Sequence, residues 1–434
     1  MKISHSHQRG NVLLTVLATT GIIGISLASY LTLTSSQNAN LMRAQSWNAA
    51  IPLAESGIEE ALTQLYYNGG SNLAVNGWSY SSGAYSKRRS FGANYVVAQI
   101  SSNANPTITV QGFVQMPTST NYISRRVQVG TLADGMFMRA MLAKNSIDLN
   151  GNNIATDSFD STDPNYSTGG MYDPAKTKDN GDVATNSGLV NSLNVGNADI
   201  YGHVATGPGG SISVGPNGAV GAAAWIAAGN HGIEPGWSRN DMNMNFPDVQ
   251  APFAGGAFTP SGGNYTGTNY TYLLTAGNYA IDSISMSGTK KMLVTGNAIL
   301  WIYSSFSMAG QTQIILAPGA TLKMYVGNTT GSGASASLGG NGIVNPGNAM
   351  NFQYFGMPSN TSLSYSGNAA FTGTVYAPNA NFSLGGGGNN IYDFVGASVT
   401  STVSMNGHFH FHYDENLGRI GPRRGYIVTS WNEI

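Results

Sequence analysis

The apolar residues of the chain are concentrated first in one long run near its start. Residues 12–33 are apolar or small, and no charged residue occurs from Gly10 through Met42. A run of this length is sufficient for one helix to cross a hydrocarbon core of about 30 Å. The side chains that we expect to span the membrane are Val12, Leu13, Leu14, Val16, Leu17, Ile22, Ile23, Ile25, Leu27, Leu31 and Leu33.

The short segment before this run, residues 1–10, is a basic leader that carries Lys2 and Arg9. A cleaved secretory signal has a shorter apolar part, about 7–15 residues, and an A-x-A-like cleavage site. No good site of that kind follows Leu33. The basic leader predicts a cytoplasmic N-terminus, a single membrane pass and a bulk of the chain that is periplasmic or extracellular.

The helical pattern continues beyond the membrane, so we expect one helix over residues 11–70. Glu55, Glu59 and Glu60 lie on the face opposite the apolar one, Pro52 predicts a kink, and Gly69-Gly70 ends the run. The apolar positions recur at three- and four-residue spacing: Leu41, Ala44, Trp47, Ala50, Ile51, Ala54, Ile58, Ala61, Leu62 and Leu65.

Residues 71–134 change to the alternation that is typical of strands. The segments NYVVAQI, TITVQGFVQM and RRVQVGTL are separated by Gly, Pro and Asn. They predict a small antiparallel β head packed on the helix.

The rest of the chain consists of short apolar segments that end in Gly and Asn corners. Such segments fill residues 135–236, resume over 271–417 after a linker at 237–270, and leave a tail at 418–434. Glycines recur before the later strands at spacings of roughly 20–30 residues, typical of one coil of a solenoid. We therefore expect a mainly β protein with a right-handed parallel β-helix; a jelly roll or sandwich is the alternative. The glycines are Gly296, Gly319, Gly347, Gly367 and Gly396.

The N-terminal pattern resembles a type IV pilin or pseudopilin. In particular, RGNVLLTVLA followed by LAESGIEEAL is similar to the PilX-type minor pilins. The resemblance implies processing between Gly10 and Asn11 and partners among other pilin or secretion-system subunits. Major pilins have a glutamate five residues into the mature chain, where this sequence has Thr15. A plain signal anchor is the alternative.

The C-terminal pattern resembles an uncharacterised β-helical domain that follows PilX-type anchors in bacterial envelope proteins. The resemblance covers about residues 270–417 and depends on TGTVYAPNANFSLGGGG and FVGASVTSTVSMNGHFHFHYDENL. A more remote similarity to bactofilin-like polymer-forming solenoids is also present. Both imply an architecture and a location, and neither implies an activity.

Composition and charge exclude several kinds of function. Only 9% of residues are charged and the net charge is -1, so we expect no nucleic-acid partner. Cysteine is absent, which excludes disulfides and thiolate chemistry. Between Ser283 and Tyr413 the only acid is Asp393, and no arginine lies between Arg239 and Arg419. Polysaccharide hydrolases and lyases need converging carboxylates, or a base beside bound calcium. We therefore expect that the chain is not an enzyme and has no cofactor.

Two clusters of metal-ligand residue types remain. His408, His410 and His412 alternate, so a strand would direct all three to one side, with Phe409 and Phe411 in the core. Steps of about 6.6–7 Å are too long for one ion, so we interpret the row as structural, with zinc or copper binding as the alternative. The other cluster, the Asp157–Asp182 loop, lacks EF-hand spacing and is rich in turn formers. We expect Asx turns there, and calcium binding stays open.

Taken together, these patterns predict a membrane-anchored, outward-facing structural protein of the bacterial envelope. Its role is that of a minor pilin or pseudopilin-like subunit, or of an adhesin-like display stalk. The alternative is a glycan-binding module or a carbohydrate-active enzyme built on the β-helix, because the 22 tyrosines and 6 tryptophans could stack on a surface glycan.

Overall fold

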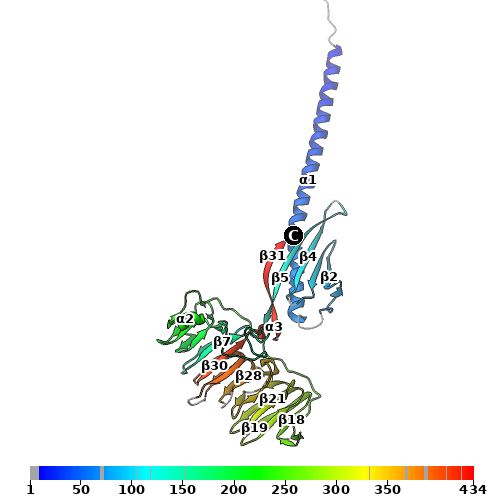
Figure 1. Ribbon diagram of the computed structural model, residues 1–434. Coiled ribbons are helices and arrows are strands. Elements are labelled where there is room, and N and C mark those ends of the chain that lie inside the picture. The colour runs from blue at the N-terminus through cyan, green and yellow to red at the C-terminus, as the bar shows by residue number, and fades with distance from the viewer. Residues whose placement is uncertain are drawn as a thin grey trace, which may run out of the picture. The chain divides into compact units, whose positions relative to one another are not determined.

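The computed structural model describes residues 9–68, 73–103, 105–117, 119–151, 153–331, 333–366, 370–385, 390–406, 408–421 and 423–434. The protein is mainly β, with one long N-terminal helix (Figure 1). The chain divides into a first unit, residues 1–133 with 425–434, and a second unit, residues 134–424.

The first unit is built on helix α1 (Arg9–Asn68), which continues through Pro52 without interruption. Its N-terminal part extends past the sheet of this unit, and its C-terminal part lies against that sheet (Figure 1). Leu41 and Trp47, which were predicted on the packed face, are 57% and 47% exposed, so packing begins later than expected. The buried positions recur at helical spacing: Ser46, Ala50, Ala54, Ile58, Ala61, Gln64 and Leu65.

Two glycines allow the helix to lie unusually close to the sheet. A Cβ atom on Gly57 would be 2.6 Å from Val96 Cγ2 and 2.7 Å from Val110 Cγ1. Across the contact, a Cβ atom on Gly112 would be 2.5 Å from the carbonyl oxygen of Ala50. The absence of a side chain at both positions therefore sets the distance between α1 and the sheet.

The sheet of the first unit pairs its first five strands in antiparallel order along the chain. Burial alternates along β4, where Ile108 and Val110 face the helix, as the period-two pattern predicts. The strands are β1 (Ser79–Ser81), β2 (Ala84–Phe91), β3 (Asn94–Ser101), β4 (Thr107–Gln115) and β5 (Tyr122–Gly135).

The C-terminal residues belong to this sheet, which corrects the expectation of a tail at 418–434. Strand β31 (Arg423–Glu433) lies next to β5 and forms the sixth strand. The Gly130 N–H donates to Ser430 Oγ at 3.2 Å, and the Ile434 N–H donates to the Arg126 carbonyl at 2.9 Å. The strand forms because the edge of β5 offers unpaired backbone groups, which the sequence of the tail alone does not reveal.

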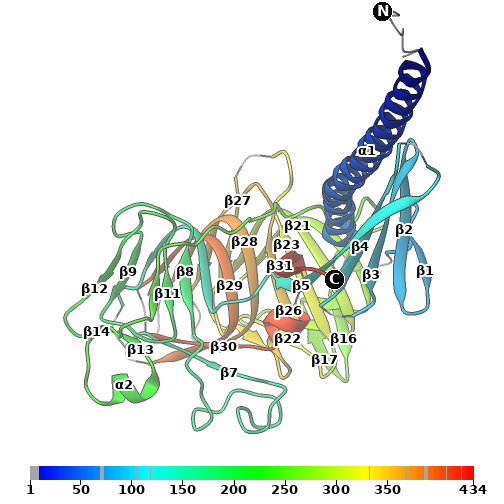
Figure 2. The ribbon, with the colours of Figure 1, turned by 90° about the horizontal axis from the view of Figure 1, so that it is seen from above.

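The second unit is a stack of parallel strands, and Figure 2 shows many of them side by side along one direction. Residues that pair between neighbouring strands are separated in the sequence by one coil of the stack. Examples are Gly277 with Ala298 and Leu322 with Phe352. Among the described residues, nineteen strands form one sheet, and β18, β20, β22 and β25 form a separate parallel sheet. The strands of the later part of the chain are β16 (Gly263–Tyr265), β17 (Thr268–Tyr270), β18 (Tyr272–Leu274), β19 (Gly277–Met286), β20 (Lys291–Val294), β21 (Asn297–Met308), β22 (Gln313–Leu316), β23 (Thr321–Val326), β24 (Ala334–Leu338), β25 (Ile343–Val344), β26 (Phe352–Gly356), β27 (Asn360–Tyr365), β28 (Phe371–Leu384), β29 (Tyr392–Met405) and β30 (Phe409–Asp414).

The order of strands in the stack differs from their order in the chain. The chain enters the stack at β6. This strand pairs with β29, and β7 pairs with β30. The two predicted β-helix parts, 135–236 and 271–417, therefore share one continuous parallel sheet. The strands of the earlier part are β6 (Met141–Asp148), β7 (Ala155–Phe159), β8 (Val183–Thr185), β9 (Leu193–Gly196), β10 (Asp199–Tyr201), β11 (Val204–Ala205), β12 (Ile212–Val214), β13 (Ala219–Gly221), β14 (Gly232–Ile233) and β15 (Ser238–Arg239).

The interior of the stack contains columns of like side chains. Phe371, Phe394 and Phe411 occupy neighbouring strands, and their ring centroids are 4.3 Å and 4.2 Å apart. All three side chains are buried, and the rings are nearly parallel. Such stacks stabilise successive turns beyond their area of burial, by about 0.5–1.5 kcal/mol for each pair.

The predicted linker is shorter than expected, because β15 and the hairpin β16–β17 fall within residues 237–270. Its strand-free part, residues 241–257, runs along the stack as a strap. Met244 exchanges hydrogen bonds with Asn186, the Pro247 carbonyl accepts from Tyr376, and Phe253 contacts Trp301 edge-on. The strap returns the chain to the opposite end of the stack. The short helices of this unit are α2 (Ala223–Ala227), η1 (Ala349–Asn351) and α3 (Leu417–Ile420).

Three of the five glycines predicted before strands can be compared directly with strand starts. Gly296 immediately precedes β21, and Gly319 lies two residues before β23. Gly396 lies inside β29 instead. Gly347 lies in the turn before η1, and Gly367 is outside the described residues.

Candidate functional site

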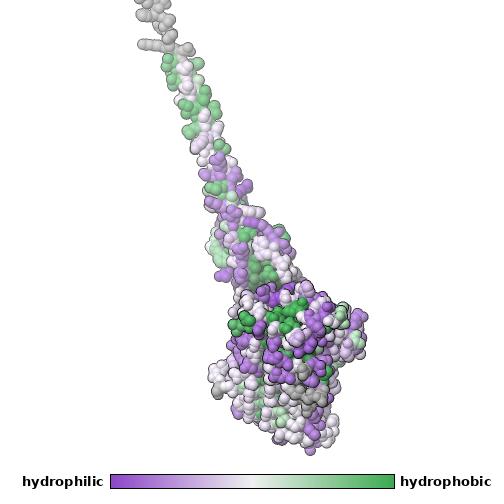
Figure 3. All heavy atoms as spheres, turned by 90° about the vertical axis from the view of Figure 1, so that its left-hand side faces the viewer, coloured by the Kyte–Doolittle hydropathy of each residue, from purple (hydrophilic) through white to green (hydrophobic). Residues whose placement is uncertain are grey.

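The exposed N-terminal part of α1 is the first functional surface. All eleven side chains that were predicted to span a membrane are exposed, from 56% for Val16 and Leu33 to 79% for Leu13. Residues 12–33 would extend about 33 Å as a helix, which matches a hydrocarbon core. Figure 3 shows hydrophobic residues concentrated along this part of the helix. The helix is long and apolar enough to cross a membrane.

The threonine hydroxyls within this apolar part donate to carbonyl oxygens of the preceding helical turn. Thr19 donates to the Thr15 carbonyl at 2.8 Å, and Thr32 donates to the Ala28 carbonyl at 2.9 Å. Threonine can therefore lie in an apolar environment without an unpaired polar group.

The predicted processing position lies at the start of the same helix. Gly10 and Asn11 are in the first turns of α1, and the Asn11 side chain is outside the described residues. Thr15 lies one turn further on and donates to the Val12 carbonyl at 3.0 Å. Processing there stays a prediction.

The alternating histidines divide into two groups. His410 and His412 lie on β30, whereas His408 lies just before the strand and has a buried Nδ1 without a partner among the described residues. Phe409 and Phe411 point into the core, as predicted. The rings of His410 and His412 are 6.1 Å apart and perpendicular to one another.

His412 is the centre of a compact cluster on this strand. Its Nδ1 lies 2.6 Å from Asp157 Oδ1, and its Nε2 lies 3.2 Å from Asp393 Oδ1. The Tyr172 ring stacks on the His412 ring at 3.6 Å, and its hydroxyl donates to Asp157 Oδ2 at 2.9 Å. The His412 side chain is only 4% exposed, whereas that of Asp393 is 49% exposed.

The carboxylates and the histidines of this cluster shift one another's pKa values. Burial opposes charge on His412, but the hydrogen bonds to Asp157 and Asp393 and the charges of both raise its pKa overall. The hydrogen bond from His412 lowers the pKa of Asp393. Burial, followed by the neighbouring His412, lowers the pKa of His410. The surroundings therefore favour the protonated form of His412 and the neutral form of His410.

The sequence did not reveal Asp157, Tyr172 and Asp393 as neighbours of the histidines. In the parallel register, Asp393 pairs with His410 and Asp157 pairs with His412. Asp157 and His412 are far apart in sequence, so no local spacing could have found the pair. Among the described residues, Asp393, His410 and His412 form a group whose ligand atoms all lie within 4.8 Å of one another.

The acid-rich loop forms turns, as predicted. Asp160, Asp163 and Asp173 each accept a backbone N–H two residues ahead, from Thr162, Asn165 and Ala175. These are Asx turns. Asp182 instead accepts a hydrogen bond from Arg139 at 2.8 Å, so the acids have separate partners.

Asp160 gives the loop a testable pH dependence. Burial opposes its charge, but hydrogen bonds from Arg419 and Thr162 outweigh burial and lower its pKa to about 2. The ionised Asp160 carboxylate therefore stabilises the fold at pH values above its pKa in the unfolded chain, and this stabilisation is lost as the pH falls toward 2. Asp160→Asn should lower the unfolding free energy by about 1–2 kcal/mol at pH 7, after discounting for the half-exposed Arg419. Urea unfolding from pH 7 to pH 2.5 should show this difference shrink below pH 4, and a difference that stays constant would contradict it.

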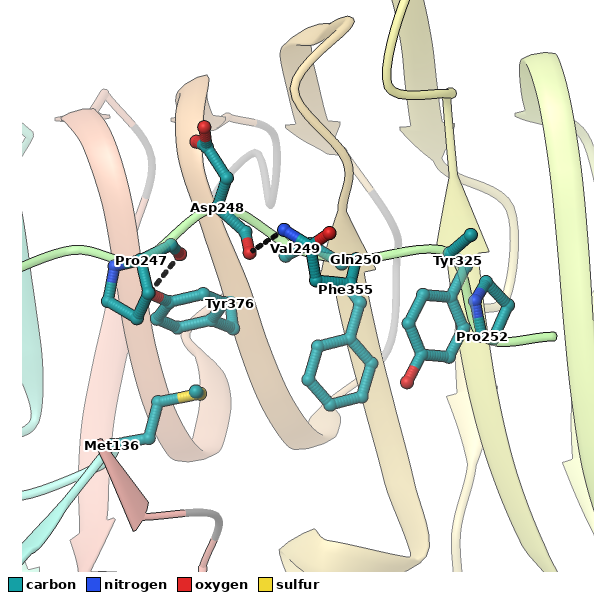
Figure 4. Close-up of a pocket in the computed structure, with 10 residues that line it drawn as sticks. Met136, Pro247, Asp248, Val249, Gln250, Pro252, Tyr325, Phe355 and Tyr376 are labelled. Carbon is teal, nitrogen blue, oxygen red and sulfur yellow. Dashed lines mark hydrogen bonds between the residues drawn. The ribbon is translucent and has the colours of Figure 1, made fainter. Parts of the chain in front are cut away.

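A cavity of about 360 Å³ lies between the strap and the stack, and Figure 4 shows the residues that line it. Tyr325 and Phe355 stack at 4.7 Å, and Tyr376 donates to the Pro247 carbonyl at 2.7 Å. The Asp248 carboxylate points away from these rings (Figure 4). Strap residues therefore line one side of the cavity, and the rings of Tyr325, Phe355 and Tyr376 line the stack side.

The family comparison concerns part of the second unit. A family model described as a domain of unknown function (DUF7305) matches residues 256–420. This range contains Asp393, His410 and His412 but neither Asp157 nor Tyr172. No curated protein matches the sequence.

Among solved structures, the chain is similar to the competence-associated pilin ComZ from Thermus thermophilus. The identity is 12% and the TM-score is 0.32, with 89% of this chain and 96% of that chain covered.

Proposed function

We propose that this protein is a membrane-anchored structural subunit of the bacterial envelope, similar to a PilX-type minor pilin or pseudopilin. Its first unit anchors and assembles, and its second unit is a right-handed parallel β-helix displayed outside the membrane. The observation that carries the proposal is the division of α1: apolar residues 12–33 are exposed, whereas the C-terminal part of the helix packs on its own sheet. A helix of this kind buries its apolar half in a bilayer or among neighbouring subunits.

The second unit supports a scaffold rather than an enzyme. Three of its acids pair with basic side chains of the same unit: Asp160 with Arg419, Asp182 with Arg139, and Glu415 with Lys178. The parallel pairings of successive turns give a rigid rod-like element of the kind used for display. We propose that it has no hydrolytic or lytic activity, and that a surface glycan or another envelope subunit is its partner.

Processing and orientation test this proposal together. The mature chain should begin at Asn11, because a prepilin-type leader ends at Gly10. Mass spectrometry of the membrane-extracted protein should find this terminus, and protease added outside intact spheroplasts should digest the chain beyond residue 34. A protein that is protected from outside protease would contradict the orientation. Retention of Met1 would contradict the pilin-type processing and leave a plain signal anchor.

A further inference from the structure

The cluster around His412 has the arrangement of a metal site more than that of a simple ion pair. Its members come from three neighbouring parallel strands: Asp393 from β29, His410 and His412 from β30, and Asp157 from β7. Strand pairing fixes their register, so the side chains converge without a flexible loop.

The Nδ1 side of His412 is held as in a ligating histidine. Asp157 Oδ1 lies 2.6 Å from this nitrogen, and Tyr172 donates to the other oxygen of the same carboxylate at 2.9 Å. The Tyr172 ring also covers the face of the imidazole at 3.6 Å. Metal-bound histidines commonly donate their second ring N–H to a carboxylate, which sets the tautomer and the ring orientation.

The Nε2 side of His412 faces the other two members. Nε2 and Asp393 Oδ1 are 3.2 Å apart. Zinc bonds of about 2.0–2.2 Å in tetrahedral geometry place neighbouring ligand atoms about 3.3–3.5 Å apart. The ligand atom of His410 lies within 4.8 Å of the others, so a shift of about an ångström brings it to this separation. His410 is only half-buried and therefore has room to move.

We propose that Asp393, His410 and His412 bind one divalent transition-metal ion of the zinc type, with Asp157 and Tyr172 as positioning residues. The ion takes the place of the proton on His412 Nε2, which leaves to solvent. The fourth position goes to water, because the Asp393 side of the cluster is exposed. The site lies where the later part of the chain meets the earlier part in the stack, so the ion would stabilise this junction.

The experiment uses the full chain in detergent, stripped with EDTA and dialysed against Zn²⁺ or Co²⁺. We expect about one ion per chain by elemental analysis, and a rise in the melting temperature that depends on Zn²⁺ concentration. His410→Ala and Asp393→Asn should each weaken Zn²⁺ binding at least tenfold. Asp157→Asn should weaken it about 10–100-fold, although it removes no ligand.

His408→Ala is the matched control, because His408 belongs to the same alternating row but lies outside the cluster. It should bind Zn²⁺ like the wild type. His410→Ala is the decisive variant, because this side chain is only half-buried, and without metal its melting temperature should match that of the wild type. Absence of stoichiometric metal in the wild type would overturn the proposal. Equal loss of binding in His408→Ala and His410→Ala would also overturn it.

Discussion

Gly396→Ala should be the most destabilising single-methyl change in the second unit. Gly396 has a φ of 147° inside strand β29, a conformation that side chains rarely adopt. It pairs with Gly373 on β28, and a Cβ atom at Gly396 would overlap the carbonyl oxygen of Gly373. Both groups are backbone in the middle of the stack, so neither can move alone. Strain of about 1–3 kcal/mol adds to an overpacking cost of about 1–3 kcal/mol.

The measurement is urea unfolding of the full chain, followed by the circular dichroism of its strands. We expect a loss of about 3–5 kcal/mol in the free energy of unfolding, or a protein that does not fold. The control is Gly385→Ala, just after β28, where a Cβ atom would meet no described residue within 4 Å. That change should cost about 0.5 kcal/mol or less. Equal effects of the two changes would show that the close approach of β28 and β29 is not a constraint.

The elements that depend on local patterns could be predicted from the sequence. The uncharged apolar run and the three- and four-residue spacing after it predict α1, because burial along a helix follows its own period. The alternation in residues 94–100 and 107–116 likewise predicts β3 and β4. The start of the packed face was misplaced, since Leu41 and Trp47 have the right spacing but stay 57% and 47% exposed. The spacing of apolar residues shows which side chains share a face of the helix. How much of that face is covered depends on the length of the sheet that packs on it, which the spacing does not show.

Strand β31 and the order of the stack could not be predicted in the same way. Tyr426, Ile427 and Val428 are consecutive apolar residues without alternation, and their strand exists because β5 has a free edge. The pairing of β6 with β29 and of β30 with β7 joins segments that are distant in the chain. The sequence therefore placed Asp157 only in the acid-rich loop and could not show that it lies beside His412.

A pair of charges at the centre of the apolar run should remove the protein from the membrane. Ile22 and Ile23 are each 64% exposed on α1 and lie midway along residues 12–33. Replacing both with aspartate costs about 2.5–3.5 kcal/mol for each residue at the centre of a membrane helix. The summed cost is large enough to reduce the fraction of chains inserted in the membrane from nearly all to a minority. Membrane fractions washed with high salt and alkaline carbonate should lose most of the variant.

The control for this change is Leu189→Asp with Val190→Asp in the second unit. These two residues are also adjacent and aliphatic, and they are 74% and 77% exposed. Their replacement adds the same charge to the chain, so any effect of net charge on solubility is matched. We expect this control to stay in the membrane fraction like the wild type. If the Ile22/Ile23 variant also stayed there after both washes, residues 12–33 would not be the anchor, and the exposed apolar side of α1 would have to be covered by protein rather than by lipid.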